Sequence, residues 1–451
     1  MLDLFPHEAS NDLAAHLSSK SRTVYAGFDP TADSLHVGNL LVLNALMHSL
    51  RAGHSAIALI GGATAKIGDP SGKKKERPEL GESEIGKNIR GIAADLKRVA
   101  ENHAKYFAGD KELGDLVITN NIQWYENVNV LEFLSRTGRY FRLGRMMARE
   151  SVKSRLDSEE GISLTEFSYQ VFQVTKFCTY NFIAQFVVCT GRIDSFQAYD
   201  WYHLYKAHGC TIQLGGSDQM GNITAGFDLV NKACDTRVYG VTLPLVTSES
   251  GDKLGKSAGD TLWLNEDKTS CFDLYQYFLR QKDADVERLL NLFSFLPKAE
   301  ISELMKRHHA APEKRAPHRK LAEQVTLLVH GVSGLELAQK TTDILYGTEP
   351  SAALAVLSPE EMRKVFGGQG VDYVRLLFSA GLCLMDFAMK IGCFKSEADA
   401  ARIIEAGGFY VNQVRRRNAE EVVMPGTHVL PNQTTLVRVG KKNYYIIEWT
   451  M

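Results

Sequence analysis

Two short segments of the sequence carry residues suited to holding phosphate groups. The first spans residues 25–39 and reads YAGFDPTADSLHVGN. This pattern predicts the end of a strand, a turn fixed by Pro30 and the start of a helix, where unpaired backbone N–H groups and the helix dipole attract anions. His36 and Asn39 would donate hydrogen bonds from the first helical turn, and Gly38 would let a nucleotide approach the backbone. A turn with an internally hydrogen-bonded histidine is the alternative.

The second segment is a basic loop at residues 253–257, which reads KLGKS. Lys253 and Lys256, on either side of a glycine, suit a mobile clamp for a pyrophosphate leaving group. The loop is not a Walker A motif, because only three residues separate Gly251 from Gly255 where that motif requires four. A solvated basic loop is the alternative interpretation.

The stretches around these segments predict an α/β fold whose strands and helices would position them. Apolar runs typical of buried strands lie at 23–28, 55–60, 116–119 and 210–214. Helical periodicity begins near residue 36 and covers 82–107, 126–136 and 217–232. Because strands and helices alternate, we expect a Rossmann-like parallel sheet flanked by helices, a fold that by itself says little about chemistry.

The rest of the chain predicts further domains. Between residues 269 and 330 the apolar residues have helical spacing, as in Leu289, Leu290 and Phe293. The tail shows two short helical stretches and then the alternation typical of strands at 436–448. We therefore expect a Rossmann-like domain at 1–246, the basic loop with an α-helical domain at 247–335, a linker at 336–370 and a small α+β domain at 371–451.

Composition argues against several classes of protein. The formal net charge is −1, so nucleic-acid binding would have to use local basic clusters such as 73–75 and 415–417. The seven cysteines form no Cys-x-x-Cys pair and lie far from any His-x-His pattern, which argues against disulfides and zinc. We expect no membrane segment, because no apolar run approaches the roughly 20 residues required. Acidic residues make 1–21 unlike a transit or signal peptide.

The two segments together match a known pair of sequence motifs. HVGN at 36–39 and KLGKS at 253–257 resemble the paired signature of the class I aminoacyl-tRNA synthetases. Further motifs resemble the tyrosyl-tRNA synthetases: GGATAKIGDPSGKKKER at 61–77, TEFSY at 165–169, AYD at 198–200 and QLGGSDQMGN at 213–222. The resemblance covers nearly the whole chain. Details such as KLGKSAG at 253–259 and YIIEW at 445–449 are most similar to the mitochondrial enzymes of animals.

This resemblance implies that the chain activates tyrosine with ATP and Mg²⁺ and esterifies it to tRNA(Tyr), with no metal bound by the protein itself. The tyrosine pocket is matched by Tyr25 and Asp200 at the phenol, by Asp69, Tyr169 and Gln173 at the ammonium, and by Asp29 and Gln213. Catalytic phosphate contacts are implied for Thr31, His36, Asn39, Lys73, Arg77, Lys253 and Lys256. Nucleotide contacts are implied for Gly38, Gly216, Asp218, Gln219, Lys256 and Ser257. Two positions depart from the family pattern, since Asn39 replaces a second histidine and Ala26 replaces a small polar residue.

The tail resembles the RNA-binding fold that these synthetases share with a small-subunit ribosomal protein. Its matching stretches are SEADAARIIEAGGFYVN at 396–412 and VRVGKKNYY at 437–445, in which basic and aromatic residues are interleaved. Such residues suit phosphate contact and base stacking. RNA contacts are therefore implied for Arg402, Arg415, Arg416, Lys441 and Lys442. A solvated β-rich tail is the alternative.

Residues 174–197 form an insertion that the family pattern lacks. In the family, the residues that correspond to Tyr169, Gln173 and Asp200 lie on one helical face at i, i+4 and i+7. Here the insertion separates Asp200 from the other two. It begins with valine and ends with Phe-Gln, as an in-frame intron left in a gene sequence could. A surface loop that lets the two helix halves realign and a catalytically damaged isoform are the other interpretations.

The resemblance also predicts an assembly and a compartment. We expect a homodimer with its interface around 121–149, in the mitochondrial matrix, with the cytoplasm of a bacterium as the alternative location. The competing function is that of a non-catalytic RNA-binding protein, because some mitochondrial relatives assist intron splicing and the insertion could have removed catalysis. RNA binding without activation of tyrosine would favour that competitor.

Overall fold

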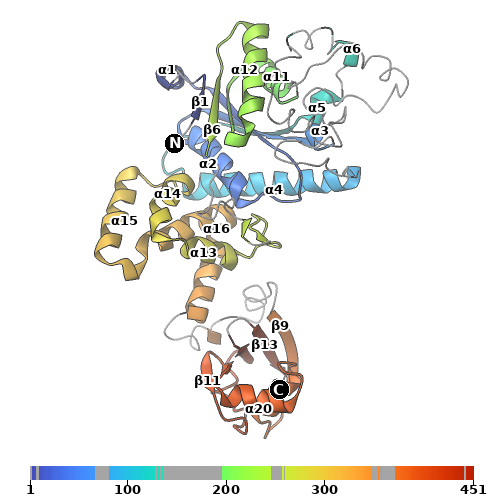
Figure 1. The fold of residues 1–451 in the computed structure, drawn as a ribbon, viewed down its shortest axis with the longest axis vertical. Helices are drawn as coiled ribbons and strands as arrows, with labels where there is room; N and C mark the ends of the chain where they lie inside the picture. Colours follow the sequence, from blue (N-terminus) through green and yellow to red (C-terminus); the bar gives the residue numbers. More distant parts are fainter. Residues whose placement is uncertain are drawn as a thin grey trace, which may run out of the picture. The chain divides into compact units, whose positions relative to one another are not determined.

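The computed structural model describes most of the chain. It covers residues 3–6, 10–66, 81–126, 129–132, 135, 140, 196–244, 256–257, 260–346, 354–355, 357, 371–440 and 443–450. The chain divides into two compact units (Figure 1). Unit 1 comprises residues 1–265 and 291–296, and unit 2 comprises residues 266–290 and 297–451.

A six-stranded sheet lies at the centre of unit 1. Its strands are β1 (Asp3–Phe5), β2 (Thr23–Phe28), β3 (Ser55–Ile60), β4 (Leu116–Asn120), β5 (Cys210–Gly216) and β6 (Tyr239–Leu243). They follow the order β1-β6-β5-β2-β3-β4, with β2 to β6 parallel and β1 antiparallel to β6. The expected Rossmann-like parallel sheet is confirmed. Strands β1 and β6 were not predicted.

Helices cover both faces of this sheet, with α11 and α12 on one side and α2 and α4 on the other (Figure 1). The helical segments of unit 1 are α1 (Ser10–Ser19), α2 (Val37–Arg51), α3 (Gly62–Ala65), α4 (Glu82–Tyr106), α5 (Ile122–Tyr125), α6 (Val130–Glu132), α11 (Phe196–His208), the 3-10 helix η3 (Ser217–Gln219) and α12 (Met220–Cys234). Every residue of β6 is buried, and so is all of β3 except Ser55. Continuous burial of this kind is expected for parallel strands covered on both faces. Within the described part of the chain, none of the helices combines the length and apolar character needed to cross a membrane.

The strand order fixes where a ligand can bind. The chain leaves β2 through α2 to reach β3 on one side, whereas β5 pairs with the other side of β2. The order therefore reverses at β2, and α/β folds bind ligands at the carboxyl ends of the strands at such a point. A short two-stranded sheet, β7 (Lys256–Ser257) with β8 (Asp260–Thr261), contains part of the predicted basic loop.

The first part of unit 2 is helical, as predicted. Its elements are α13 (Cys271–Leu279), α14 (Asp283–Phe293, of which 291–293 belong to unit 1), α15 (Lys298–Ala310), η4 (Pro312–Lys314) and α16 (Ala316–Tyr346). Helix α16 is broken at Gly331, which has a φ of 70° that a residue with a side chain rarely adopts.

The second part of unit 2 is a five-stranded sheet with two helices, α19 (Leu384–Lys390) and α20 (Glu397–Glu405). The strands are β9 (Val371–Leu377), β10 (Phe409–Val411), β11 (Val414–Arg416), β12 (Thr434–Val439) and β13 (Asn443–Thr450), in the order β11-β10-β12-β13-β9. The core centres on Trp449, whose ring stacks on Phe387 and whose Nε1 donates to Thr435 Oγ1 at 2.8 Å. Strand β9, parallel to β13, was not predicted.

Candidate active site

A cavity of about 360 Å³ opens at the carboxyl ends of β2 and β5, the position that the strand order predicts. Its walls come from the loop after β2, the start of α2 and the turn after β5. Eleven residues predicted for the site line it: Tyr25, Asp29, Thr31, His36, Gly38, Asn39, Asp200, Gln213, Gly216, Asp218 and Gln219. Residues separated by nearly two hundred positions in the sequence therefore meet in one cavity.

His36 and Asn39 form a reciprocal cap at the start of α2. The backbone N–H of Asn39 donates to Nδ1 of His36 at 3.3 Å, and the backbone N–H of His36 donates to Oδ1 of Asn39 at 3.1 Å. Since Nδ1 of His36 accepts a hydrogen bond, a neutral ring carries its proton on Nε2. The cap thus orients both side chains at a helix N-terminus, where the dipole favours an anion.

The segment after β8 brings the basic loop back to this cap. The backbone N–H of Val37 donates to the carbonyl of Leu262 at 3.0 Å, and His36 forms a β-bridge with Trp263. In the short hairpin, Lys256 pairs with Thr261, which directly precedes Leu262. The backbones of the two signature segments are therefore neighbours, as the pairing of the motifs requires.

The deep end of the cavity holds a phenol and a carboxylate. Tyr25 and Asp200 are each 2% exposed. Oxygens of Asp200 accept hydrogen bonds from Nδ2 of Asn121 at 3.2 Å and from Nε1 of Trp124 at 3.0 Å. Burial raises the pKa of Asp200 to about 7, although donors from Asn121, Trp124 and Tyr125 act in the opposite direction. Burial, together with the charge of Asp200, also raises the pKa of Tyr25.

Residues at the end of β5 form the other wall. Gln213 is buried, and its Oε1 has no hydrogen-bond partner within the described residues, as expected of an acceptor kept for a ligand. A Cβ at Gly216 would lie 2.5 Å from Oδ1 of Asp218, so a side chain there would require the Asp218 carboxylate to move. Asp218 and Gln219 follow in η3, directly before α12.

Helix α4 holds the loop between β2 and α2 in place. Nδ2 of Asn88 donates to the carbonyl of Pro30 at 3.1 Å. Oδ2 of the buried Asp95 accepts from the hydroxyl of Ser34 at 2.8 Å and from the backbone N–H of Leu35 at 2.9 Å. Beside this loop, the hydroxyl of Thr64 donates to Oδ1 of Asp29 at 2.8 Å.

These supporting residues were missed by the sequence analysis. Asn121, Trp124 and Tyr125 act on Asp200 from a turn 75 or more positions earlier, with no recognisable spacing. Only indirect reasoning could have predicted these three residues. A carboxylate expected in a dry pocket needs hydrogen-bond donors, and the polar and aromatic residues after β4 could supply them.

Several predicted residues lie outside the described part of the chain. They are Asp69, Lys73, Arg77, Tyr169, Gln173, Lys253, Lys441 and Lys442, together with the side chains of Lys256 and Ser257. Most of the insertion 174–197 and most of the predicted dimer interface around 121–149 also lie outside it. Their roles stay predictions.

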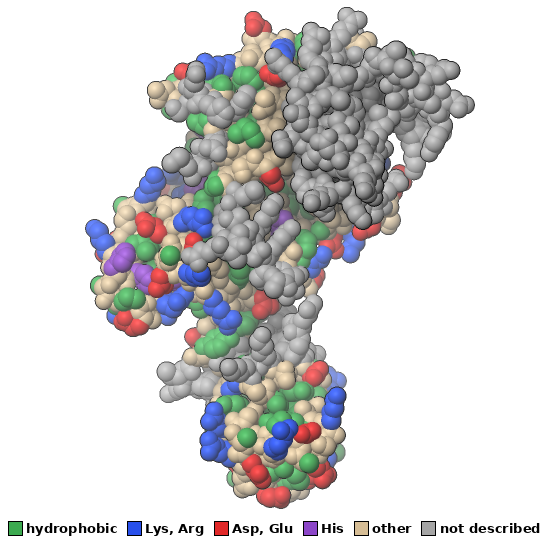
Figure 2. All heavy atoms as spheres, in the orientation of Figure 1, with side chains coloured by type: hydrophobic (Ala, Val, Ile, Leu, Met, Phe, Trp, Pro, Cys, Tyr) green, Lys and Arg blue, Asp and Glu red, His purple; other side chains and the backbone are tan. Residues whose placement is uncertain are grey.

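The described residues of the predicted RNA surface fall into two groups. Arg415 donates to the hydroxyl of Tyr410 at 2.7 Å, and the guanidinium of Arg438 lies 3.7 Å from the centre of that ring. Arg416 instead pairs with Glu421 at 2.8 Å, with a side chain that is only 16% exposed. Arg402 pairs with Asp399 at 2.8 Å on α20. Basic side chains are interspersed with acidic and apolar ones on the visible face of this sheet domain (Figure 2).

Comparison with known proteins agrees with this architecture. Residues 18–190 and 195–347 match the family described as tRNA synthetases class I (W and Y), and the break between the two matches falls inside the insertion. The mitochondrial tyrosine–tRNA ligase of Drosophila melanogaster is 48% identical over 451 residues, which is 99% of this chain and 91% of the relative. The human mitochondrial tyrosine–tRNA ligase is 43% identical over 96% of this chain and 85% of the relative.

A solved structure also resembles this chain. The C-terminally truncated mitochondrial tyrosyl-tRNA synthetase of Aspergillus nidulans superimposes with a TM-score of 0.64 and is 31% identical, covering 75% of this chain and 89% of that structure. The cavity at the switch point of the sheet, the adjacent signature segments and these relatives agree. This chain belongs to the class I tRNA synthetases and, within them, to the family of the tyrosine–tRNA ligases.

Proposed function

We propose that this chain activates tyrosine with ATP and then transfers it to tRNA(Tyr). The observation that carries the proposal is one cavity lined both by a buried phenol and carboxylate and by a capped helix N-terminus. The first pair has the chemistry to recognise a hydroxylated aromatic ring, and the helix N-terminus has the chemistry to hold phosphate.

The deep end supports selection of tyrosine. A substrate phenol would donate to the carboxylate of Asp200 and accept from the hydroxyl of Tyr25. Phenylalanine lacks the hydroxyl that would make these two hydrogen bonds, and its ring would keep water from replacing them, so its binding would be weaker. Asp69, Tyr169 and Gln173 are proposed for the ammonium group, and Asp29 and Gln213 for further contacts to the amino acid.

The other end supports adenylate formation. An oxygen of the tyrosine carboxylate forms a bond to the α-phosphorus of ATP while the bond to pyrophosphate breaks, so no protein nucleophile is required. Donors and cations would stabilise the charge that develops on the phosphates, and Mg²⁺ would bind them as part of the substrate. The proposed groups are His36 and Asn39 at the helix cap, Thr31 beside it, and Lys73, Arg77, Lys253 and Lys256 from the segments outside the described part. Gly38, Gly216, Asp218, Gln219 and Ser257 are proposed for the nucleotide.

The second step joins the product to RNA. A ribose hydroxyl at the end of the tRNA attacks the carbonyl carbon of the adenylate, and AMP leaves. The sheet domain of unit 2 is proposed to hold the tRNA through Arg415 and Arg438 around Tyr410, with Lys441 and Lys442 nearby in sequence. We further propose a homodimer that works in the mitochondrial matrix, which agrees with the compartment in the names of the most similar animal relatives.

Charging of RNA tests this proposal. The purified chain, ATP, Mg²⁺ and radiolabelled tyrosine are incubated with a transcript of mitochondrial tRNA(Tyr), and with tRNA(Trp) as the control. The proposal expects acid-precipitable label on tRNA(Tyr) alone. Tight binding of tRNA(Tyr) without any charging would instead identify a non-catalytic RNA-binding protein.

A further inference from the structure

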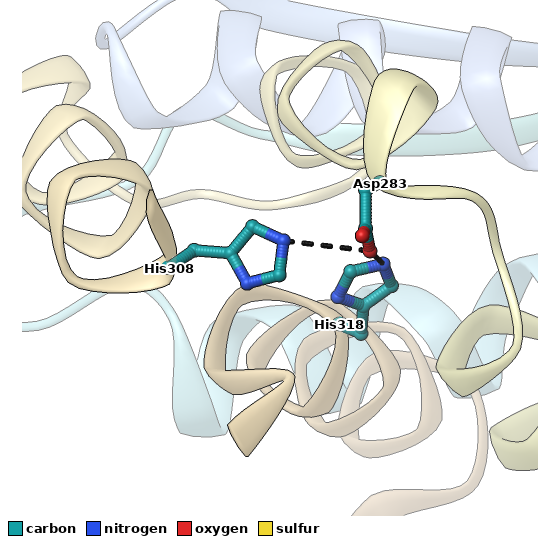
Figure 3. Close-up of side chains that lie close together, drawn as sticks. All are labelled: Asp283, His308 and His318. Carbon is teal, nitrogen blue, oxygen red and sulfur yellow. Dashed lines mark ion pairs between the residues drawn. The ribbon is translucent and has the colours of Figure 1, made fainter. Parts of the chain in front are cut away.

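Three metal-ligating side chains converge in the helical part of unit 2, and none of them lines the active-site cavity. Asp283 is the first residue of α14, His308 lies in the last turn of α15 and His318 lies in the first turn of α16. Both imidazole rings point toward the Asp283 carboxylate (Figure 3). Nε2 of His308 lies 3.4 Å from Oδ1 of Asp283, and Nε2 of His318 lies 3.0 Å from the same oxygen.

These separations fit a common metal ion. The three candidate ligand atoms all lie within 4.8 Å of one another. Around a tetrahedral zinc ion with bonds of about 2.1 Å, ligand atoms are separated by about 3.4 Å. The two distances to Asp283, 3.0 and 3.4 Å, lie close to that value.

An ordinary ion pair does not explain the cluster. The side chain of His318 is 0% exposed. Although its Nε2 approaches Asp283, neither nitrogen of His318 makes a hydrogen bond within the described residues. The backbone of Gln281 lies close enough to raise the pKa of His318, but the pair does not meet the distance and angle limits of a hydrogen bond. Buried polar atoms of this kind are costly unless a partner satisfies them.

Arg315 is the group that could compete with a cation. Its Nη1 lies 3.9 Å from Oδ1 of Asp283. The guanidinium is oriented mainly by two backbone carbonyls, because its Nη2 donates to Leu279 at 3.0 Å and to Gln281 at 2.8 Å. The Asp283 side chain is 57% exposed, which leaves a path for an ion and room for water as a further ligand.

We propose that Asp283, His308 and His318 form a binding site for a divalent transition-metal ion, and that zinc is the ion it takes. Two imidazole nitrogens and one carboxylate oxygen, completed by water, are a ligand set that zinc accepts. The ion would tie the start of α14, the end of α15 and the start of α16 together, so its role is to stabilise the helical domain. No local pattern indicates this site, because 25 and 10 positions separate successive ligands.

Zinc titration of the untagged full-length protein, stripped with a chelator, tests the site. The variants are Asp283→Asn, which changes an exposed side chain and should fold normally, and His318→Gln, which keeps a polar side chain. His309→Ala is the matched control, because His309 is the exposed neighbour of His308. We expect one zinc per chain in the wild type and in His309→Ala, with binding at least tenfold weaker in Asp283→Asn and His318→Gln.

Thermal unfolding gives an independent measurement. Zinc at a hundredfold excess over the wild-type Kd should raise the Tm of the wild type by roughly 5 °C, and it should raise the Tm of Asp283→Asn by no more than about half as much. Equal zinc affinity in the wild type and Asp283→Asn, or no zinc binding by the wild type, overturns the proposal. Neither result bears on tyrosine activation, which uses other residues.

Discussion

At the scale of single residues, the site depends on how Asp200 is held. Its carboxylate is buried without a cation among the partners described, and neutral donors from Asn121, Trp124 and Tyr125 stabilise its charge. These donors replace the water that would solvate the carboxylate outside the protein, and they orient it. In the proposed pocket, specificity for a phenol would therefore depend on residues that need not touch the substrate.

Replacing Trp124 tests this arrangement. In Trp124→Phe the aromatic contact with His203, at 4.4 Å between ring centres, can persist while the hydrogen bond to Asp200 is lost. A hydrogen bond to a charged group contributes about 1.5–3 kcal/mol. We expect the KM for tyrosine in ATP–pyrophosphate exchange to rise roughly tenfold to a hundredfold, with little change in the KM for ATP.

The neighbouring residue supplies the control for that experiment. Gln123 is exposed on the same turn, and Gln123→Ala should leave both KM values close to those of the wild type. An unchanged KM for tyrosine in Trp124→Phe would show that Asp200 does not depend on this donor.

The raised pKa of Asp200 has a consequence for stability without ligand. Between about pH 4 and pH 7 the folded chain keeps a proton on Asp200 that the unfolded chain has released, because burial raises the pKa from 3.8 to about 7. The folded state then binds more protons, so this group makes the free energy of unfolding fall as pH rises through that window. Asp200→Asn lacks the effect, although its amide satisfies one fewer donor at every pH.

Urea unfolding of unit 1 at pH 5 and pH 8 measures the difference. We expect Asp200→Asn to gain stability relative to the wild type on going from pH 5 to pH 8. Parallel pH profiles for the two proteins would mean that Asp200 titrates normally in the folded state.

The sequence analysis was strongest for residues inside motifs. Five of the predicted residues line the cavity: Tyr25, His36, Asn39, Asp200 and Gln213. They could be predicted because each belongs to a segment whose pattern is recognisable in the sequence. Asn121 and Trp124 could not be assigned in the same way, since their importance arises only when the end of β4 is placed beside α11. That placement is a property of the sheet order and not of any local pattern.

At the scale of elements, α4 supports the loop between β2 and α2 that is proposed to hold phosphate. The helix approaches the loop so closely that a Cβ on Gly91 would lie 2.0 Å from the carbonyl oxygen of Asp33. Gly86 in the same helix has space, with only the end of the Arg90 side chain within 4 Å, at 3.6 Å. A side chain therefore fits at Gly86 and does not fit at Gly91.

This contrast makes a matched pair of variants. Gly91→Ala should destabilise unit 1 by about 1–3 kcal/mol through overpacking and should lower the rate of adenylate formation, because the loop that contains His36 must move. Gly86→Ala should be neutral or stabilise by up to about 1 kcal/mol, because alanine is the better helix former. Urea unfolding and pyrophosphate exchange measure both effects. If the two variants behaved alike, the loop would not depend on close contact with α4.

Strands were predicted where the sequence has a local run of apolar residues. The predicted runs at 23–28 and 55–60 coincide with β2 and β3, which are mostly apolar, whereas the fully buried β6 was missed. Strand β9 escaped notice because its described side chains are partly exposed and its partner, β13, lies about seventy positions later. A parallel pairing over such a distance leaves no local signal.

At the scale of the whole molecule, two kinds of chemistry occupy two units. Unit 1 holds the cavity, and the sheet of unit 2 carries a partly exposed group in which the guanidinium groups of Arg415 and Arg438 lie near the ring of Tyr410. Composition alone cannot identify which arginines are exposed. Arg416, which the motif implied, is largely buried against Glu421 and has little surface to offer RNA.

A pair of arginine variants tests the RNA surface. Arg438→Ala should weaken tRNA binding by roughly threefold to tenfold and reduce the slope of log affinity against log salt by about 1, because one phosphate contact is lost. Arg375→Ala is the control on the same sheet, since Arg375 is paired with Glu448 at 3.0 Å. Filter binding at several salt concentrations measures both. Identical salt slopes for the two variants would place the RNA elsewhere.

The central claim is that one cavity receives a phenol and ATP together, in the chain as it stands with residues 174–197 present. Tyrosine-dependent ATP–pyrophosphate exchange by the purified full-length protein measures this directly. We predict exchange that requires tyrosine and is not supported by phenylalanine or tryptophan at the same concentrations. Exchange that is absent with tyrosine, or equal with phenylalanine, would contradict the account.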